Sequence, residues 1–352
     1  MAQAIRVLVV DDSALVRQIL SKGLSMDPDI TVVGTAADPY IARDQIIKLR
    51  PDVLTLDVEM PRMDGVAFLR KLMPQFPLPI VMVSSLTQRG KQITMDALEA
   101  GAVDFVTKPT SNMAQGLNAM LGELRAKIKI ASRANVAHWK NRRIEPHQAA
   151  STLSSKALAE STDKVIAIGA STGGTEAIKK VITQFPANAP GVVIVQHMPP
   201  GFTKMFAERL NQLCAMEVKE AETGDRIRQG LILVAPGALQ LEVERSGGIY
   251  QVKCYPGEKV SGHCPSVDVM MNSVAKHVGR NAVGVMLTGM GSDGANGMLA
   301  MKQAGARNIA QDEATSVVFG MPKVAFDKGG AEQLVPIENI ASKVISLLTE
   351  RK

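Results

Sequence analysis

The chain has 352 residues, enough for two domains of ordinary size, and 46% of them are hydrophobic but only 3% aromatic. Its 40 Lys and Arg residues exceed its 34 Asp and Glu residues, but the excess is spread along the chain, which argues against a strongly basic nucleic-acid-binding module. No apolar run reaches the ~20 residues that a membrane span needs, and the first residues lack the pattern of a signal peptide.

Residues 1–130 alternate strand and helix signals five times. The predicted strands are Ile5–Val10, Ile30–Thr35, Asp52–Leu56, Pro79–Val83 and Val103–Val106. Ser13 and Asp38 are typical N-caps for the helices that follow the first two strands. Such alternation predicts a doubly wound α/β domain, a parallel sheet with helices on both faces.

Polar side chains follow four of these strands at the point where each strand ends. They are Asp11 and Asp12 after the first strand, Asp57 after the third, Ser84 after the fourth and Lys108 after the fifth. We expect them to converge, because the carboxyl ends of parallel strands meet at one edge of the sheet. Three carboxylates repel one another unless a cation intervenes, and Mg²⁺ prefers such oxygen ligands. Singly, the paired aspartates could be a helix cap and Lys-Pro a turn.

The combination and order of these residues resemble a two-component receiver domain. The resemblance implies a flavodoxin-like fold for residues 1–130 and a phosphoacceptor role for Asp57. The implied ligands of Mg²⁺ are Asp11, Asp12, Asp57 and the backbone carbonyl of Glu59. The implied partners of the phosphoryl group are Lys108, which contacts it, and Ser84, which supplies the switch hydroxyl.

A second alternating pattern follows a polar segment. Residues 131–160 have few periodic apolar positions, and we interpret them as a linker. Residues 161–352 predict another doubly wound parallel-sheet domain, Rossmann-like in its order of elements. A hairpin is predicted within it, with strands Leu239–Arg245 and Ile249–Cys254 joined at Ser246-Gly247-Gly248.

The second domain has a serine in a turn flanked by glycines. The apolar run Lys164–Ile168 leads into Gly169-Ala-Ser171-Thr-Gly173, and a helical pattern follows. Glycines let the chain turn tightly, so the Ser171 hydroxyl is expected at the strand end. The free N–H groups of the new helix can then face a developing oxyanion. The motif alone is weak evidence, because glycine-serine turns are common.

Two later strands end on residues of matching chemistry. Gly191–Val195 leads to His197, and Ala282–Leu287 leads to a glycine-rich loop that contains Asp293. Each residue has a plain structural alternative, such as a helix cap for Asp293. Three strand ends that carry serine, histidine and aspartate together favour a catalytic site at one edge of the sheet.

These residues predict acyl transfer by a catalytic triad. Ser171 is the expected nucleophile, His197 the general base and then acid, and Asp293 the residue that orients the imidazole. The backbone N–H groups near Thr172 and around Met290 are candidate oxyanion donors, and the sequence does not choose between them.

The loop around Asp293 permits a second interpretation. Gly289-Met-Gly-Ser-Asp-Gly294 matches G-x-G-x-x-G, and Asp312 follows about 20 residues further on, as in a dinucleotide-binding site. That interpretation places a carboxylate beside the pyrophosphate and leaves Ser171 and His197 unexplained.

A response regulator with a DNA-binding output is a further alternative. It is disfavoured by the even distribution of charge and by the absence of a helix-turn-helix pattern.

The three cysteines, Cys214, Cys254 and Cys264, have no C-x-x-C spacing. Cys254 and Cys264 could form a metal site together with His263 and His277, but the spacing matches no zinc pattern. Structural thiols in a reduced, cytoplasmic protein are the simpler interpretation.

A receiver followed by these motifs resembles one family, the chemotaxis protein-glutamate methylesterases (CheB). The resemblance covers nearly the whole chain. It implies a cytoplasmic hydrolase that demethylates glutamate methyl esters on chemoreceptors, releases methanol and deamidates receptor glutamines. Both reactions pass through an oxyanion and an acyl-serine, so one triad serves both. Methyl-accepting receptors are the implied substrates, a chemotaxis histidine kinase the phosphodonor, and Mg²⁺ in the receiver the only cofactor.

Overall fold

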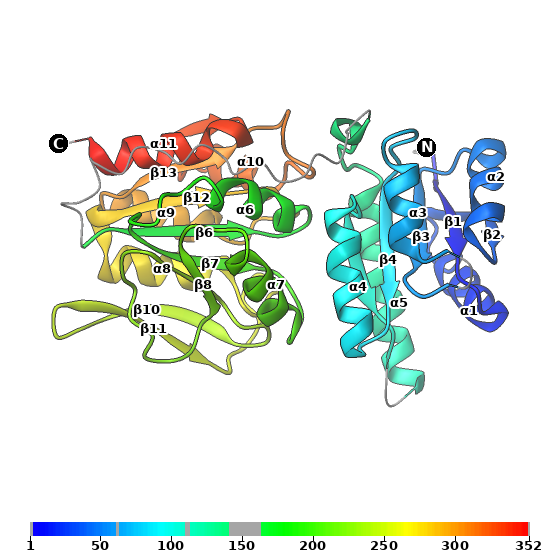
Figure 1. Ribbon diagram of the computed structural model, residues 1–352, viewed down its shortest axis with the longest axis horizontal. Coiled ribbons are helices and arrows are strands. Elements are labelled where there is room, and N and C mark those ends of the chain that lie inside the picture. Colours follow the sequence, from blue (N-terminus) through cyan, green and yellow to red (C-terminus); the bar gives the residue numbers. More distant parts are fainter. Residues whose placement is uncertain (1–2, 61–62, 110–112, 141–162, 351–352) are drawn as a thin grey trace. The chain divides into compact units, whose positions relative to one another are not determined.

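The computed structural model describes residues 3–60, 63–109, 113–140 and 163–350. The chain divides into two compact units, Met1–Glu145 and Pro146–Lys352 (Figure 1). The predicted linker, 131–160, lies largely outside the described residues, so its bounds and those of the two domains stay predictions. No helix in the described ranges is long and apolar enough to cross a membrane.

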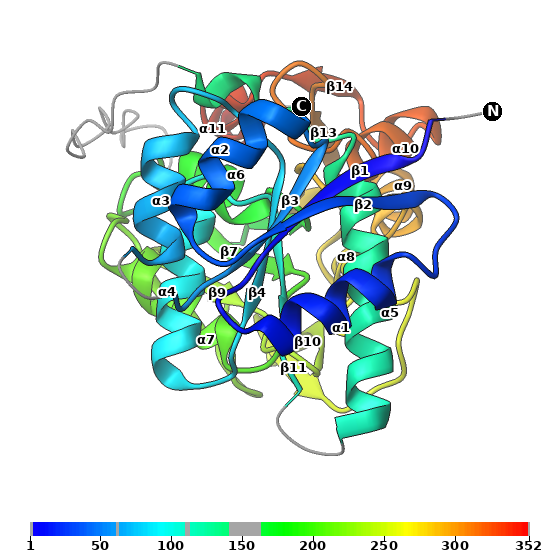
Figure 2. The ribbon, with the colours of Figure 1, turned by 90° about the vertical axis from the view of Figure 1, so that its right-hand side faces the viewer.

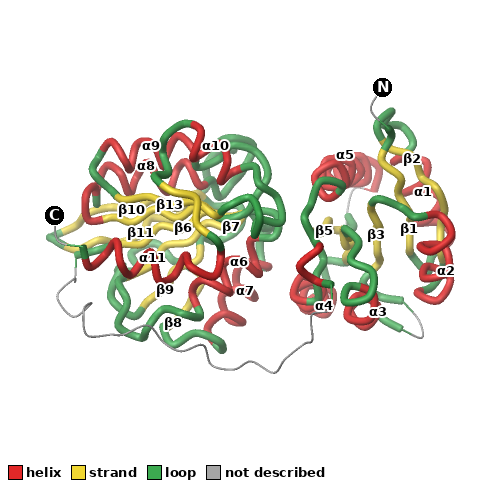
Figure 3. Tube along the Cα trace, turned by 90° about the horizontal axis from the view of Figure 1, so that it is seen from above, coloured by secondary structure: helices red, strands yellow, loops and turns green. Residues whose placement is uncertain are grey.

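The first unit is a five-stranded parallel sheet between two layers of helices. Its strands are β1 (Ile5–Val10), β2 (Ile30–Ala36), β3 (Val53–Asp57), β4 (Ile80–Ser84) and β5 (Asp104–Thr107). Its helices are α1 (Ala14–Leu24), α2 (Pro39–Leu49), α3 (Gly65–Leu72), α4 (Gln88–Glu99) and α5 (Met113–Ala131), followed by a 3₁₀ turn at Ala137–Trp139. The strand order is β2-β1-β3-β4-β5, with α1 and α5 on one face and α2, α3 and α4 on the other (Figure 2 and Figure 3).

Local signals in the sequence explain where these elements begin. The Ser13 hydroxyl accepts a hydrogen bond from Val16 N at the start of α1, and the Asp38 carboxylate accepts from Tyr40 N and Ile41 N at the start of α2. Strands β3 and β4 are buried along their whole length. Because helices cover both faces, these strands are mostly apolar and do not alternate between apolar and polar residues.

The second unit is a seven-stranded parallel sheet with a separate antiparallel hairpin. The strands of the sheet are β6 (Val165–Ala170), β7 (Gly191–Gln196), β8 (Glu217–Glu220), β9 (Leu231–Val234), β12 (Ala282–Met286), β13 (Arg307–Gln311) and β14 (Gln333–Val335). The hairpin is β10 (Gln240–Ser246) and β11 (Ile249–Tyr255). The helices are α6 (Gly174–Ile182), α7 (Phe202–Asn211), α8 (Val267–His277), α9 (Ala295–Gln303), α10 (Met321–Asp327) and α11 (Ile337–Thr349), with a 3₁₀ turn at Gly279–Asn281.

The strand order of this sheet, β14-β13-β12-β6-β7-β9-β8, reverses beside β6. The chain adds β7, β8 and β9 on one side of β6, and later β12, β13 and β14 on the other. Helices α6, α7 and α11 cover one face, and α8, α9 and α10 cover the other (Figure 3). Open α/β sheets bind ligands at such a switch point, beyond the carboxyl ends of the strands.

Both predicted parallel sheets are confirmed, and the predicted hairpin is present. Ser246 pairs with Ile249 across its turn. Gly247 and Gly248 have φ angles of 54° and 88°, which side chains rarely adopt. The glycine pair is therefore the residue choice that this tight hairpin turn requires.

Candidate catalytic and phosphoacceptor sites

Ser171 stands directly beyond β6 in a turn that depends on glycine. Gly173 has a φ of 76°, and a Cβ there would lie 2.6 Å from the Cβ of Val317, so both backbone and neighbour require glycine. Ser171 N donates to Thr288 O at 3.0 Å, which fixes the turn against the end of β12. Helix α6 begins at Gly173 as N-cap, without a side-chain cap. Ser171 is therefore not the cap of that helix.

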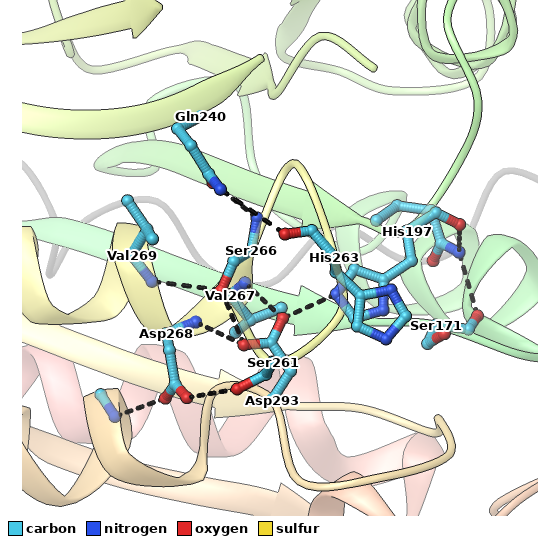
Figure 4. Close-up of polar contacts among 12 residues, drawn as sticks. Ser171, His197, Gln240, Ser261, His263, Ser266, Val267, Asp268, Val269 and Asp293 are labelled. Carbon is cyan, nitrogen blue, oxygen red and sulfur yellow. Dashed lines mark hydrogen bonds and ion pairs between the residues drawn. The ribbon is translucent and has the colours of Figure 1, made fainter. Parts of the chain in front are cut away.

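His197 and Asp293 form a buried pair next to this turn. His197 Nε2 lies 2.8 Å from Asp293 Oδ2, and the two side chains are 7% and 1% exposed. His197 N donates to Ala170 O at 3.2 Å, so the histidine follows β7 just beside Ser171. In the view of Figure 4 the imidazole lies between Asp293 and Ser171.

The second ring nitrogen of His197 is the one suited to act as a base. Nδ1 is buried and has no hydrogen-bond partner among the described residues. An ionised Asp293 accepts the proton on Nε2, so the neutral ring carries its lone pair on Nδ1. The pair thus presents an unpaired acceptor inside the site, while a carboxylate holds the opposite edge of the ring.

The start of α8 supplies three further donors to Asp293. Ser266 Oγ donates at 2.7 Å, Val267 N at 2.8 Å and Asp268 N at 3.0 Å (Figure 4). Burial alone would raise the pKa of Asp293. The hydrogen bond and charge of His197 and the hydrogen bonds from α8 outweigh burial and hold that pKa below its usual value. The positive end of a helix dipole acts in the same direction.

Asp293 does not cap the helix that follows it. The N-cap of α9 is Gly294, with a φ of 88° and no side-chain cap. Instead, Asp268 of α8 accepts a hydrogen bond from Gly297 N in α9 at 2.7 Å. The carboxyl group at the start of each of these two helices therefore accepts hydrogen bonds from N–H groups at the start of the other. A dinucleotide-binding site puts its pyrophosphate where the Asp268 carboxyl group lies, so the fold gives that alternative no support.

Both candidate oxyanion segments lie beside Ser171. Thr172 is buried, and its carbonyl accepts from Thr288 Oγ1 at 3.0 Å. Met290 follows Gly289, and a Cβ on Gly289 would lie 2.8 Å from the Cβ of Ser171. The Met290 side chain is 39% exposed. The backbone N–H groups of Thr172 and Met290 are thus both candidate donors to the oxyanion.

Sequence reasoning missed several polar residues around the triad candidates. The ring of His263 stacks on that of His197, with centroids 3.7 Å apart and an interplanar angle of 6°. Gln311 Oε1 accepts from Thr288 N at 2.8 Å. Ser266, a serine just before an apolar helical run, carried a readable N-cap signal. The sequence indicates His263 only as a candidate metal ligand, and no such cluster forms around it within the described ranges.

In the first unit, Asp11, Asp12 and Asp57 converge as predicted. One oxygen from each lies within 4.8 Å of the others. Lys108 Nζ donates to Asp11 Oδ2 at 3.0 Å and to Asp57 Oδ1 at 2.9 Å. Burial raises the pKa of Asp57 to about 6, and the Asp11 charge adds to this, whereas Lys108 opposes it. Three carboxylates against one ammonium leave an excess of negative charge among oxygen ligands, which fits a hard divalent cation.

The two other residues predicted for this site are Ser84, at the end of β4, and Glu59, beyond β3. Ser84 is fully buried, and its Oγ is hydrogen-bonded on the α4 side, to Gly90 O at 3.2 Å and Thr94 Oγ1 at 2.5 Å. None of its described contacts reaches Asp57. Glu59 lies two residues beyond Asp57, in the segment between β3 and α3.

Residues 166–344 match the CheB methylesterase family, and residues 7–120 match the response regulator receiver domain family. The chain belongs to the CheB methylesterase family. It is 72% identical, over 100% of both chains, to the protein-glutamate methylesterase/protein-glutamine glutaminase of Syntrophotalea carbinolica. The protein of the same name from Salmonella typhimurium is 54% identical over 98% of this chain and 97% of its own length.

A solved structure supports the same assignment for the second unit. The Thermotoga maritima CheB methylesterase catalytic domain matches with a TM-score of 0.52 and 38% identity, over 53% of this chain and 99% of that chain. The predicted pairing of a receiver domain with a CheB catalytic domain is therefore confirmed.

Proposed function

We propose that this chain hydrolyses glutamate methyl esters on chemoreceptors, releasing methanol, and deamidates receptor glutamines under the control of its receiver domain. The observation that carries the proposal is the pairing of His197 with a buried, ionised Asp293 next to the Ser171 turn. The buried Nδ1 of His197 has no partner among the described residues and is available for a proton.

Acylation begins at Ser171. His197 Nδ1 takes the hydroxyl proton as Ser171 Oγ bonds to the ester carbonyl carbon, and the carbonyl electron pair moves to oxygen. The backbone N–H groups of Thr172 and Met290 are the candidate donors to that oxyanion. The oxyanion then collapses, the bond to the methoxy oxygen breaks, and His197 returns the proton so that methanol leaves. With glutamine, ammonia leaves in the same step.

Deacylation reverses the roles with water as the nucleophile. His197 Nδ1 takes a proton from water as the water oxygen bonds to the acyl carbon. The bond to Ser171 Oγ then breaks, and His197 returns the proton to that oxygen, which frees a glutamate. Asp293 stays ionised throughout and stabilises the imidazolium through Nε2–H.

The receiver is proposed to take a phosphoryl group on Asp57 from a chemotaxis histidine kinase in the cytoplasm. Asp11, Asp12, Asp57 and the Glu59 carbonyl would hold Mg²⁺, which when bound offsets the negative charge of the phosphoryl group. The Lys108 ammonium, already bonded to Asp57, is positioned to contact a phosphoryl oxygen. Ser84 would leave its α4 partners to contact the same group. The proposed bounds are 1–130 for the receiver, 131–160 for the linker and 161–352 for the catalytic domain.

Methanol release from methylated receptors tests the esterase assignment. Ser171→Ala should lower turnover by at least ~10³-fold, because the members of a triad act as a unit. Ser246→Ala, at an exposed serine in the hairpin turn, is the matched control and should keep full activity. Circular dichroism confirms that both variants fold. Wild-type turnover by Ser171→Ala would show that this serine is not the nucleophile.

A further inference from the structure

The segment between β11 and α8, residues 256–266, brings a second histidine to the base. The rings of His263 and His197 stack nearly parallel, with centroids 3.7 Å apart. We propose that His263 is a positioning residue that holds the His197 ring where Nε2 faces Asp293 and Nδ1 faces Ser171. The inference rests on the proposed function, since it assigns His263 a task in the same reaction.

A tight turn fixes the backbone of His263. Val260 and His263 exchange two hydrogen bonds, His263 N to Val260 O at 2.9 Å and Val260 N to His263 O at 3.0 Å. The residues between them, Ser261 and Gly262, have φ angles of 52° and 84°, the pattern of a type I′ turn. Serine adopts a positive φ at some cost. Ser261 Oγ donates to Asp268 at 3.3 Å, which ties the strained residue to α8.

Gln240 of β10 fixes the same segment from the other side. Its side chain is 2% exposed, and its Nε2 donates to Glu258 O at 2.8 Å and to His263 O at 3.5 Å. Its Oε1 accepts from Ser266 N at 2.9 Å (Figure 4). The segment that carries His263 is therefore anchored to β10 and to α8, and its ring has a fixed place over His197.

The stack adds a second restraint on the His197 ring to the one that Asp293 supplies. Before substrate arrives, Asp293 holds one edge of the His197 ring, and Nδ1 has no partner among the described residues. The hydrogen bond to Asp293 alone does not fix the rotation of the ring about its Cβ–Cγ bond. A parallel ring on one face opposes that rotation. Because a misplacement of ~1 Å can cost about 10²-fold in rate, a modest restraint has a measurable effect.

Two substitutions separate stacking from the chemistry of the His263 nitrogens. In the full chain, His263→Ala removes the ring, and His263→Phe keeps a flat ring without nitrogen. We expect His263→Ala to lower kcat for methanol release by about 3- to 10-fold, the value of one aromatic contact, with KM little changed. His263→Phe should recover most of kcat. His277→Ala, at the far end of α8, is the matched control and should behave as wild type.

Each other outcome contradicts the inference. Equal loss in His263→Ala and His263→Phe would show that a ring nitrogen acts on the substrate. A change confined to KM would assign His263 to binding, and full kcat in His263→Ala would show that the stack has no role. Failure of the proposed function is seen separately, as a wild-type chain that releases no methanol.

A measurement without turnover tests the same restraint. The proton on His197 Nε2, held by Asp293, should give a low-field proton resonance in the wild-type chain and in His263→Phe. In His263→Ala we expect the signal to broaden, because a looser ring lets this proton exchange with water. An equally sharp signal in His263→Ala would overturn the inference whatever the activity shows.

Discussion

Asp57 and Asp293 are buried aspartates that follow strands of two similar sheets, yet their pKa values shift in opposite directions. Asp57 is the last residue of β3, Asp293 lies in the loop between β12 and α9, and the two residues are 5% and 2% exposed. The pKa of Asp57 is raised to about 6, whereas that of Asp293 is lowered. Burial raises both pKa values, so the difference comes from what surrounds each carboxyl group.

The hydrogen-bond donors around each carboxylate decide whether its pKa is raised or lowered. Asp293 accepts from His197, Ser266 Oγ and two N–H groups at the start of α8. Asp57 accepts from Val58 N and Lys108, and it shares Lys108 with a second carboxylate. Asp293 is therefore a fixed charge that supports a neighbour. Asp57 stands in an excess of negative charge that a cation would relieve, which is consistent with its proposed role as phosphoacceptor.

The largest expected effect concerns the fixed carboxylate. Asp293→Asn should lower kcat for methanol release by about 10³- to 10⁴-fold with KM little changed, because an amide supports the wrong tautomer of His197. Steady-state kinetics on methylated receptor measures both constants. Asp312→Asn, the acidic residue of the dinucleotide alternative, is the control and should stay near wild type. A kcat within ~10-fold of wild type in Asp293→Asn would remove Asp293 from the mechanism.

The second prediction concerns Asp57, the proposed phosphoacceptor. Acetyl phosphate with Mg²⁺ should add one phosphoryl group per chain, and Asp57→Asn or metal chelation should each abolish the addition. Asp52→Asn, at an exposed aspartate just before β3, is the matched control and should be labelled like wild type. Intact-mass spectrometry counts the groups added. Equal labelling of Asp57→Asn would place the acceptor elsewhere.

The smallest effects should have opposite signs in the two units. Without metal at pH 7, Asp57→Asn should raise the free energy of unfolding of the first unit by about 1–2 kcal/mol, because it removes one of the crowded buried charges. Asp293→Asn should lower that of the second unit by about 1–3 kcal/mol, because donors at the start of α8 lose an ionic acceptor.

Amide hydrogen exchange reports the two units separately and can test both signs. Saturating Mg²⁺ should remove the higher free energy of unfolding of Asp57→Asn, because the cation stabilises the wild-type carboxylate cluster. If both variants shifted stability in the same direction, the contrast between the two carboxylates would be wrong.

The sequence predicted the parts of both sites that depend on strand ends. Asp57, His197 and Asp293 each follow an apolar run, and parallel strands bring such residues to one edge whatever the details of packing. The glycines around Ser171 predicted its turn for a similarly local reason. These features follow from residue type and from position along the chain.

What the sequence did not predict depends on contacts between distant segments. His263 reaches His197 from a turn that is hydrogen-bonded to Gln240 and Asp268, two residues of other elements. The hydrogen bonds that Asp293 and Asp268 accept from each other's helix require α8 and α9 to begin side by side. The hydrogen bonds of Ser84 with α4 depend on the packing of that helix on β4. None of these contacts leaves a periodic pattern or a spaced motif.

Labelling with a serine-reactive phosphonate tests the central claim, that Ser171 is the nucleophile activated by His197. The full chain should gain the mass of one phosphonyl group, and the modified peptide should contain Ser171. His197→Gln should slow the labelling strongly, whereas Ser246→Ala should not change it. A phosphonyl group on a different serine, or unmodified chain after full loss of methanol release, would contradict the account.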